Sequence, residues 1–335
     1  NYSTMGEIAY RGSIVAGAIF AICAFLTYPL PLFFSALLIG ASIKVLRAIA
    51  FALQSDGFTY IRGDAAEKTA GSEVKVMTWN ICGIGGGMHY DHGGVISWRS
   101  RLDRIVQTIQ REKPDVLILQ EIYDTELAEA LRKKLGSQYV HFFTHLGPNV
   151  WGSEGGLMVA TKNALCNFTH TSFVNNDWTL NRGFATFELQ NSRGQPYLRI
   201  VGTHLIHGTN NEKRKVQIDQ IHQAIQELPH LPTVIAGDLN IERDEEGREI
   251  LSPLLIHGYL GQQPTCTNRL VEQWYETTKG APDETIDYIS LFKKHAGQTR
   301  IKDCKTLEDG FNPKTFDTRT ALSDHQPLIA CIRGL

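Results

Sequence analysis

The hydrophobic pattern divides the chain into two parts. From Gly12 to Ile43 the sequence has no charged residue, which makes this stretch too apolar for a surface helix of a soluble domain. Pro29 and Pro31 lie near its middle and should interrupt a helix, because proline lacks the backbone N–H that a helix needs. The pattern therefore predicts a membrane-associated hydrophobic helical hairpin over residues 1–53, followed by a polar linker over residues 54–73.

Positive charges flank the apolar stretch, with Arg11 before it and Lys44 and Arg47 at its far end. Because positively charged flanks stay in the cytoplasm, we expect a membrane location with the remaining domain on the cytoplasmic side. Each arm is short for a full span, so a spanning hairpin and a monotopic hairpin both stay open. A cleaved signal peptide would have a much shorter apolar core, which argues against that alternative.

Residues 74–335 show the alternation expected of one large α/β domain. Apolar residues recur at helical spacing in 98–112, 125–135 and 218–228. Short apolar runs predict strands at 74–79, 116–119, 155–161, 184–189, 197–203, 233–236, 286–291 and 328–332. Strands joined by hairpins, with a few helices between them, are typical of two packed sheets that helices cover on the outside.

Composition narrows the classes of function. The chain has 33 Lys+Arg and 35 Asp+Glu and a net charge of -2, so we expect no stable nucleic-acid partner. The six cysteines are scattered and none forms a Cys-x-x-Cys pair. That spacing disfavours a zinc knuckle, and it favours free thiols over a disulfide framework.

Polar and ionisable residues stand at the ends of several apolar strands. Burying an unpaired carboxylate is costly, so acids in such places normally have a cation, a metal ion or several donors beside them. Oxygen-rich ligand sets favour Mg²⁺, or Mn²⁺, over zinc. If these strand ends converge, they have the composition of a metal-assisted phosphoryl-transfer site. The residues concerned are Asn80, Glu121, His204, Asp238, Asn240, Asp287, Asp324 and His325.

These segments, in this order, resemble the endonuclease/exonuclease/phosphatase superfamily, whose members share the DNase I-like four-layer α/β sandwich. Within it, the chain looks most like the membrane-bound neutral sphingomyelinases. The resemblance rests on the segments that begin at Glu121, Arg182, Gly202 and Thr265. It implies two packed, mainly antiparallel sheets flanked by helices over residues 74–335.

The resemblance also implies a role for each residue of the motifs. Glu121 would be the main ligand of the metal, with Asn80 and Asp324 supporting it. His325 would be the general base, with Asp287 orienting its ring. The residues expected to assist at the phosphate or at the attacking water are His204, Asp238 and Asn240.

Two aromatic residues, Trp274 and Tyr275, precede Asp287 in a polar stretch and are candidate contacts for a head group. Together these features predict a membrane-tethered, Mg²⁺-dependent phosphodiesterase that hydrolyses a phospholipid, with sphingomyelin cleaved to ceramide and phosphocholine. The alternatives are a phosphoinositide 5-phosphatase, an endonuclease of the same superfamily, or a non-catalytic membrane scaffold. Few Lys or Arg residues stand in the loops expected near the site, which disfavours the phosphatase. The oligomeric state stays open.

Overall fold

The computed structural model describes residues 42, 45, 56–69, 71–84, 87, 94–147, 155–176, 180–208, 211–259, 261, 263–270 and 282–335. Within these residues, no helix combines the length and the apolar character needed to cross a membrane. The predicted hairpin over residues 1–53 lies outside the described residues, apart from Ser42 and Val45. Trp274 and Tyr275 lie outside them as well.

The strands of the described residues form two sheets. The first has the order β1 (Thr59–Arg62), β4 (His141–Thr144), β5 (Met158–Thr161), β3 (Val116–Gln120), β2 (Glu73–Asn80), β13 (Leu328–Arg333) and β12 (Arg300–Thr306). The second has the order β10 (Leu255–His257), β11 (Asp287–Phe292), β9 (Thr233–Asp238), β8 (Pro196–His204), β7 (Gly183–Gln190) and β6 (Leu165–Ser172).

One pair of neighbouring strands in each sheet is parallel, namely β2 with β3 and β8 with β9, and the other pairs are antiparallel. Strands of a parallel pair end at the same edge of a sheet. The residues that follow β2 and β3, and those that follow β8 and β9, are therefore neighbours in space.

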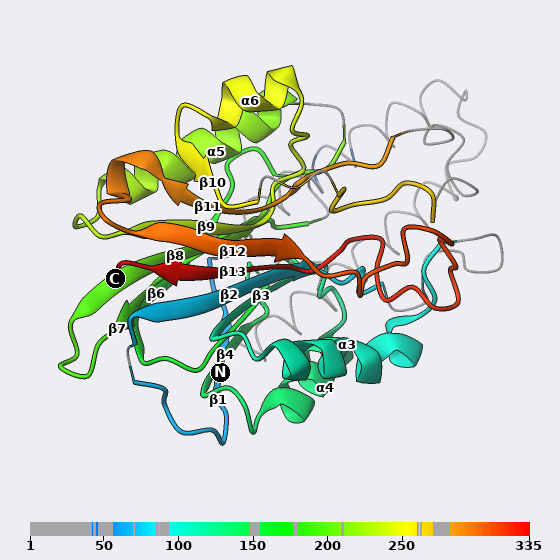
Figure 1. Cartoon of the computed structure of the whole chain (residues 1–335), viewed down its shortest axis with the longest axis horizontal. Helices are drawn as coiled ribbons and strands as arrows, with labels where there is room; N and C mark the ends of the chain where they lie inside the picture. The colour runs from blue at the N-terminus through cyan, green and yellow to red at the C-terminus, as the bar shows by residue number, and fades with distance from the viewer. Residues whose placement is uncertain are drawn as a thin grey trace.

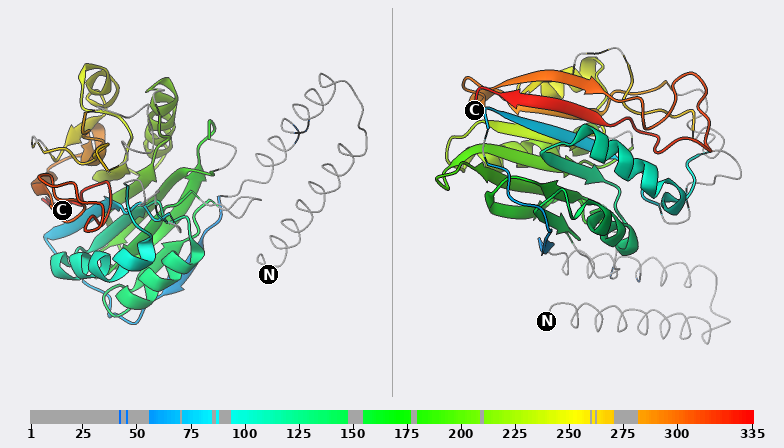
Figure 2. Two further views of the ribbon diagram at one scale, coloured as in Figure 1. Left: turned by 90° about the vertical axis from the view of Figure 1, so that its right-hand side faces the viewer. Right: turned by 60° about the horizontal axis from the view of Figure 1, so that its bottom comes forward.

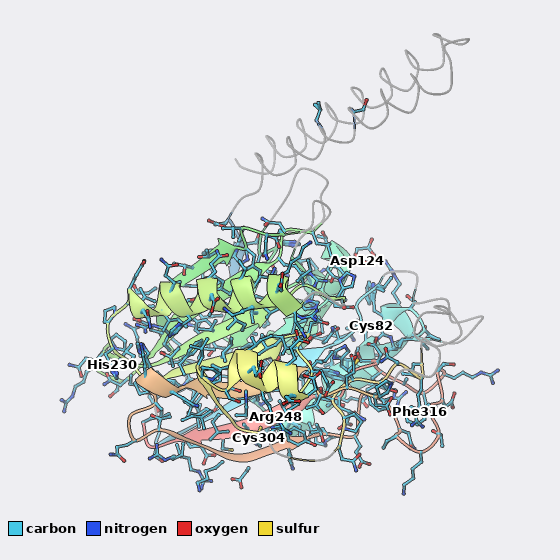
Figure 3. The ribbon with its side chains drawn as sticks, turned by 90° about the horizontal axis from the view of Figure 1, so that it is seen from above. Cys82, Asp124, His230, Arg248, Cys304 and Phe316 are labelled. Carbon is cyan, nitrogen blue, oxygen red and sulfur yellow. The ribbon has the colours of Figure 1, made fainter. Side chains whose placement is uncertain are left out.

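The two sheets pack face to face and are covered by helices on their outer sides (Figures 1 and 2). Helices α3 (Trp98–Glu112) and α4 (Thr125–Leu135) pack on the first sheet, and α5 (Asn211–Gln226) and α6 (Glu245–Leu251) pack on the second. Figure 3 shows α5 and α6 lying over the second sheet. A short 3-10 helix, Lys293–His295, follows β11. This arrangement is the predicted four-layer sandwich.

Alternating side chains build the two sides of each sheet. In β2, Val74 and Val76 belong to the core between the sheets, whereas Met77 and Trp79 belong to the core under α3 and α4. The period of two along a strand is the physical reason, since successive side chains point to opposite faces. The polar residues at the strand ends follow the same alternation.

The two predicted helices at 98–112 and 125–135 have the bounds that the sequence indicates. The strands β1, β4, β6, β10 and β12 and the helix α6 were not predicted. All of these strands except β4 lie at an edge of their sheet. Edge strands contact solvent and carry polar residues, so their hydrophobic pattern is weak. Because β1 lies inside residues 54–73 and pairs with β4, the predicted linker needs correction: the folded domain begins before residue 74.

Candidate active site

The polar residues at the strand ends point into the space between the sheets. Asn80 lies on the same face of β2 as Val74 and Val76, which belong to the core between the sheets. Asp238 likewise lies on the same face of β9 as Val234 and Ala236. The Asn80 Nδ2 group donates to Asp238 Oδ2 over 3.1 Å and to Glu121 Oε1 over 3.1 Å. This amide therefore joins the ends of both sheets at one point.

His204 and Asp287 are placed inward by the same alternation, in β8 and β11. His204 Nε2 lies 3.5 Å from Asp238 Oδ2. The close approach of β8 and β9 here depends on Gly237, because a Cβ at that position would lie 2.0 Å from the Thr203 carbonyl oxygen. The glycine before Asp238 thus allows this carboxylate to lie close to His204.

His325 lies between two carboxylates. Its Nδ1 is 2.8 Å from Asp287 Oδ2, and its Nε2 is 3.8 Å from Asp238 Oδ2. A carboxylate only accepts hydrogen bonds, so Nδ1 carries a proton and Nε2 faces the centre of the site. The backbone of His325 is held as well, since Trp79 Nε1 donates to its carbonyl oxygen over 3.0 Å. This is the predicted orientation of His325 by Asp287.

The electrostatics of this cluster follow from burial and from the neighbouring charges. Burial, and then the charge of Asp287, raise the pKa of Asp238 to about 7. Burial opposes a charge on His325, but Cys266, Asp287 and Asp238 favour it and raise the pKa of the imidazole well above its ordinary value. Burial raises the pKa of the Cys266 thiol to about 12, so that thiol is neutral near pH 7 and the two carboxylates are the effective cause.

A second pair of acids, Glu121 and Asp324, lies beside this cluster. Glu121 directly follows β3 with a left-handed φ of 62°, a conformation that is uncommon for residues other than glycine. Burial, and then the charge of Asp324, raise the pKa of Glu121. A carboxylate whose pKa is raised by a neighbouring carboxylate marks a position where a cation would be favoured.

Two sets of side chains could therefore hold a metal ion. One is the buried group Asp238, Asp287 and His325, whose ligand atoms lie within 4.8 Å of one another. The other is the pair Glu121 and Asp324. We favour the pair, because two carboxylates supply the oxygen ligands that Mg²⁺ prefers, whereas the other group includes an imidazole.

Asn80 differs from a metal ligand in its orientation. Its side-chain oxygen accepts from the Cys82 backbone N–H over 3.1 Å, which turns its N–H group toward Glu121 and Asp238. An N–H group cannot ligate a cation, so in this geometry Asn80 holds the acids in place.

Asn240 is fixed close to the same centre. Its backbone N–H donates to Asp238 Oδ1 over 2.9 Å, and its side-chain Nδ2 donates to the Leu205 carbonyl oxygen over 3.0 Å. Burial, and then the charge of Arg182, lower the pKa of His204 well below its ordinary value. His204 is therefore a neutral imidazole near pH 7, and its Nδ1 has no hydrogen-bond partner among the described residues.

The sequence reasoning assigned no role to two buried arginines that lie near the site. Arg182 Nη1 donates to the Leu205 carbonyl oxygen over 2.6 Å, and its Nη2 lies 3.5 Å from the Tyr123 hydroxyl. Arg101 of α3 donates to the carbonyl oxygens of Ile81 and Leu322, which ties the segment that follows Asn80 to the loop that carries Asp324. An arginine directly before an apolar strand was the available signal for Arg182, whereas nothing in the helix distinguished Arg101.

Comparison with known proteins agrees with this geometry. The model of the Endonuclease/Exonuclease/phosphatase family matches residues 77–325, a stretch that begins before Asn80 and ends at His325. Sphingomyelinase C from Listeria ivanovii is 25% identical over 319 residues, which cover 81% of this chain and 92% of that protein. A 5′-tyrosyl-DNA phosphodiesterase from Caenorhabditis elegans is 25% identical over 189 residues, which cover 54% of this chain and 46% of that protein.

A solved structure shows the same fold. A double mutant of beta toxin from Staphylococcus aureus, with bound magnesium ions, is similar with a TM-score of 0.62 and 19% sequence identity. The match covers 77% of this chain and 99% of that chain. The likeness identifies the four-layer sandwich as the DNase I-like fold.

Proposed function

The chain belongs to the endonuclease/exonuclease/phosphatase family, and we propose that it is a metal-dependent phosphodiesterase that cleaves sphingomyelin to ceramide and phosphocholine. One observation carries this proposal: His325 stands between Asp287 and Asp238 beside the acid pair Glu121 and Asp324. The similarity to sphingomyelinase C over 81% of the chain supports the choice of substrate.

In the proposed mechanism, water attacks the phosphorus in line with the leaving ceramide oxygen. The P–O bond to ceramide breaks, and the ceramide oxygen takes a proton from solvent. His325 Nε2 accepts the proton of the attacking water, while Asp287 holds the opposite ring nitrogen and stabilises the imidazolium. The charge of Asp238 favours a protonated His325, and burial, followed by the charge of Asp287, raises the pKa of Asp238 to about 7. When Asp238 holds the proton instead, Nε2 of His325 is free to accept one from the attacking water.

Three polar side chains would bind the phosphate oxygens in this mechanism. His204 and Asn240 lie next to Asp238 and would donate to oxygens on which charge develops. Arg182 adds a buried positive charge, and its Nε has no hydrogen-bond partner among the described residues. A phosphodiester anion would give this guanidinium an additional partner.

The acids Glu121 and Asp324 would hold a divalent cation, Mg²⁺ or Mn²⁺. Burial, followed by the charge of Asp324, raises the pKa of Glu121, and two neighbouring carboxylates are suited to a hard cation with oxygen ligands. When bound, the cation would neutralise negative charge on the phosphate. Asn80 would keep Glu121 in place through its 3.1 Å hydrogen bond.

We also propose that the chain acts while attached to a membrane, with the catalytic domain on its cytoplasmic side. The charge-free stretch from Gly12 to Ile43 supports the attachment, and the positively charged flanks support the orientation. A tether of this kind would confine the site to the lipid surface and raise the effective concentration of substrate. Trp274 and Tyr275 stay candidates for contact with the choline group.

A second candidate substrate is the phosphodiester between tyrosine and a DNA 5′ end. The similarity to the Caenorhabditis elegans tyrosyl-DNA phosphodiesterase favours it, although that match covers 54% of this chain. The net charge of -2 argues against it, because nucleic-acid binding draws on positive charge.

A substrate panel separates the candidates. Purified full-length protein in mixed micelles would be given sphingomyelin, a phosphoinositide or a 5′-tyrosyl oligonucleotide, with Mg²⁺ or with a chelator. We expect Mg²⁺-dependent release of phosphocholine that the His325→Ala variant lacks. Inorganic phosphate as the main product, or turnover of the oligonucleotide alone, would refute the sphingomyelinase assignment.

A further inference from the structure

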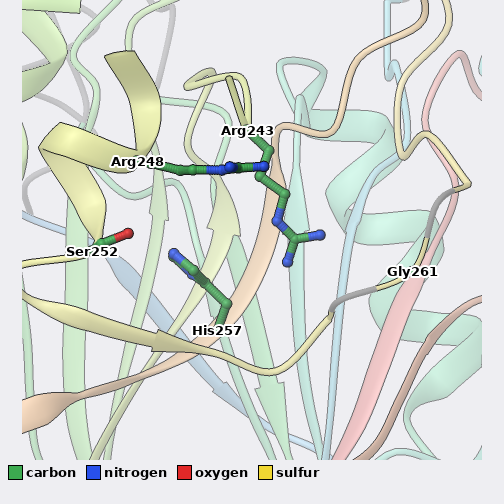
Figure 4. Close-up of a pocket in the computed structure, with 5 residues that line it drawn as sticks. All are labelled: Arg243, Arg248, Ser252, His257 and Gly261. Carbon is green, nitrogen blue, oxygen red and sulfur yellow. The ribbon is translucent and has the colours of Figure 1, made fainter. Parts of the chain in front are cut away.

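A pocket lies between α6 and β10, outside the candidate active site. It has a volume of about 390 Å³, which is within the range of small-molecule sites. Figure 4 shows its lining residues, with Arg248 extending toward Arg243 and the ring of His257 directed toward Ser252 and Arg248. The lining residues are Arg243, Arg248, Ser252, His257 and Gly261.

The pocket has two cationic side chains and no acidic lining residue. The guanidinium of Arg248 has no hydrogen-bond or ion-pair partner within the part of the chain that the structure describes. Arg243 donates through Nη2 to the Tyr259 carbonyl oxygen, which leaves its other N–H groups available.

Two nearby acids accept hydrogen bonds from backbone N–H groups. Asp244 accepts from the Gly247 backbone N–H as the N-cap of α6. Glu242 accepts from the Thr285 backbone N–H over 2.9 Å. Neither carboxylate lines the pocket, so the two arginines are not neutralised from within it.

His257 adds a neutral polar group to this lining. Burial, and then the charges of Arg243 and Lys293, lower the pKa of His257 to about 4. Its Nδ1 lies 2.9 Å from Ser290 Oγ. When Ser290 donates to Nδ1, the neutral ring carries its proton on Nε2 and can donate to an anion.

We propose that this pocket binds the phosphate group of an anion, held by the guanidinium groups of Arg243 and Arg248 with His257 and Ser252 as additional donors. Arginine matches phosphate because its planar fork can give two parallel hydrogen bonds to phosphate oxygens. The phosphate could belong to a phospholipid head group or to a free soluble anion, and both offer the same chemistry.

The pocket is a separate site from the catalytic cluster. His257 pairs with Ser290, which lies three residues along β11 from Asp287. At about 3.3 Å per residue, this separation is roughly 10 Å, so an anion in the pocket would not occupy the position beside His325. Arg243 follows Asn240 by three residues, so the two sites share one loop.

Thermal unfolding of the full-length chain in non-ionic micelles tests the proposal. Inorganic phosphate would be titrated at constant ionic strength with a chelator present, and the affinity taken from the rise in unfolding temperature. Arg248→Gln should weaken phosphate binding by roughly tenfold or more, because a charge-assisted bidentate contact is lost. Arg248→Lys keeps the positive charge but lacks the planar guanidinium, so its affinity for phosphate should lie between those of wild type and Arg248→Gln.

Arg193→Gln is the matched control, because Arg193 lies on the exposed hairpin between β7 and β8 and should bind no phosphate in this pocket. Equal phosphate affinity in wild type and Arg248→Gln would overturn the proposal. An equal loss in Arg193→Gln would also overturn it, since binding would then reflect general surface charge.

A second titration with short-chain phosphatidic acid in the same micelles distinguishes the sources. Stabilisation by this lipid that exceeds the effect of inorganic phosphate, and that Arg248→Gln loses, would identify a lipid head group. Stabilisation by inorganic phosphate alone, again lost in Arg248→Gln, would identify a soluble anion.

Discussion

The side-chain amide of Asn80 donates to Asp238 Oδ2 over 3.1 Å and thereby connects the end of β2 in one sheet to the end of β9 in the other. The same amide donates to Glu121 Oε1, so one neutral donor contacts both the buried Asp238 and the half-buried Glu121. The relative position of Glu121 and Asp238 therefore depends on Asn80 as well as on the strands β3 and β9.

Replacement of Asn80 should therefore disturb catalysis more than folding. We expect Asn80→Ala to lower kcat for diester hydrolysis by roughly a hundredfold, because Glu121 and Asp238 lose a shared donor. Steady-state kinetics and the unfolding temperature of the same preparation check this. A kcat within a factor of about two of wild type would show that the acids do not need the amide.

Asp287→Asn should leave the fold intact and lower kcat by about a thousandfold or more, because an amide can hold His325 in the wrong tautomer. The 2.8 Å contact between Asp287 and His325 is the reason for this expectation. Single-turnover rates measure the effect on the chemical step. Unchanged single-turnover rates would contradict the role of Asp287 in orienting the ring.

Glu121→Gln and His325→Ala should both abolish turnover but differ in metal binding. Titration calorimetry with Mg²⁺ should give an affinity at least about tenfold weaker for Glu121→Gln, since one carboxylate charge is lost from the pair with Asp324. His325→Ala should bind Mg²⁺ nearly as wild type does. The reverse pattern would place the cation in the Asp238, Asp287 and His325 group instead.

Arg182→Met should raise KM and lower kcat together, because the buried charge near Glu121 and His204 would be absent in both the ground state and the transition state. A combined loss of roughly a hundredfold in kcat/KM is expected for a charged contact to phosphate. Arg182→Lys should recover part of it. Wild-type kcat/KM in Arg182→Met would exclude a role for this guanidinium in substrate binding.

The stability of the domain should fall in mild acid partly because of His170. Burial lowers the pKa of His170 to about 4, and neither ring nitrogen has a hydrogen-bond partner among the described residues. A depressed histidine pKa means that the neutral ring is favoured in the folded state. The contribution of His170 to the free energy of unfolding is therefore fully present above pH 6.5. It is lost as the pH falls toward 4, and the loss is about 3 kcal/mol.

Unfolding temperatures measured from neutral pH to pH 4 check this expectation. His170→Gln should show a smaller loss of stability over that window than wild type. Equal pH dependence in the two proteins would contradict the assignment to His170.

The helices α3, α4 and α5 and most of the central strands could be predicted from the sequence, because their hydrophobic periodicity is local. Strand β4, with 4 residues, and helix α6, with 7 residues, are too short to show such a period and were missed. Leu102, Ile105 and Ile109 recur along one face of α3, and Val74 and Val76 alternate in β2. The edge strands β1, β6, β10 and β12 lacked such a pattern. Their pairing depends on backbone groups of a neighbouring strand, which no local pattern in the chain identifies.

The chemistry of the candidate site was also determined by the sequence, because carboxylates, amides and imidazoles at the ends of apolar strands require partners when buried. Only the tertiary structure decided which partner each one has. It turned the N–H group of Asn80 toward the acids, brought Arg182 beside Tyr123, and set the unpaired Arg248 next to Arg243. These relationships join residues that are distant in the chain, and their geometry depends on how the two sheets and their loops pack.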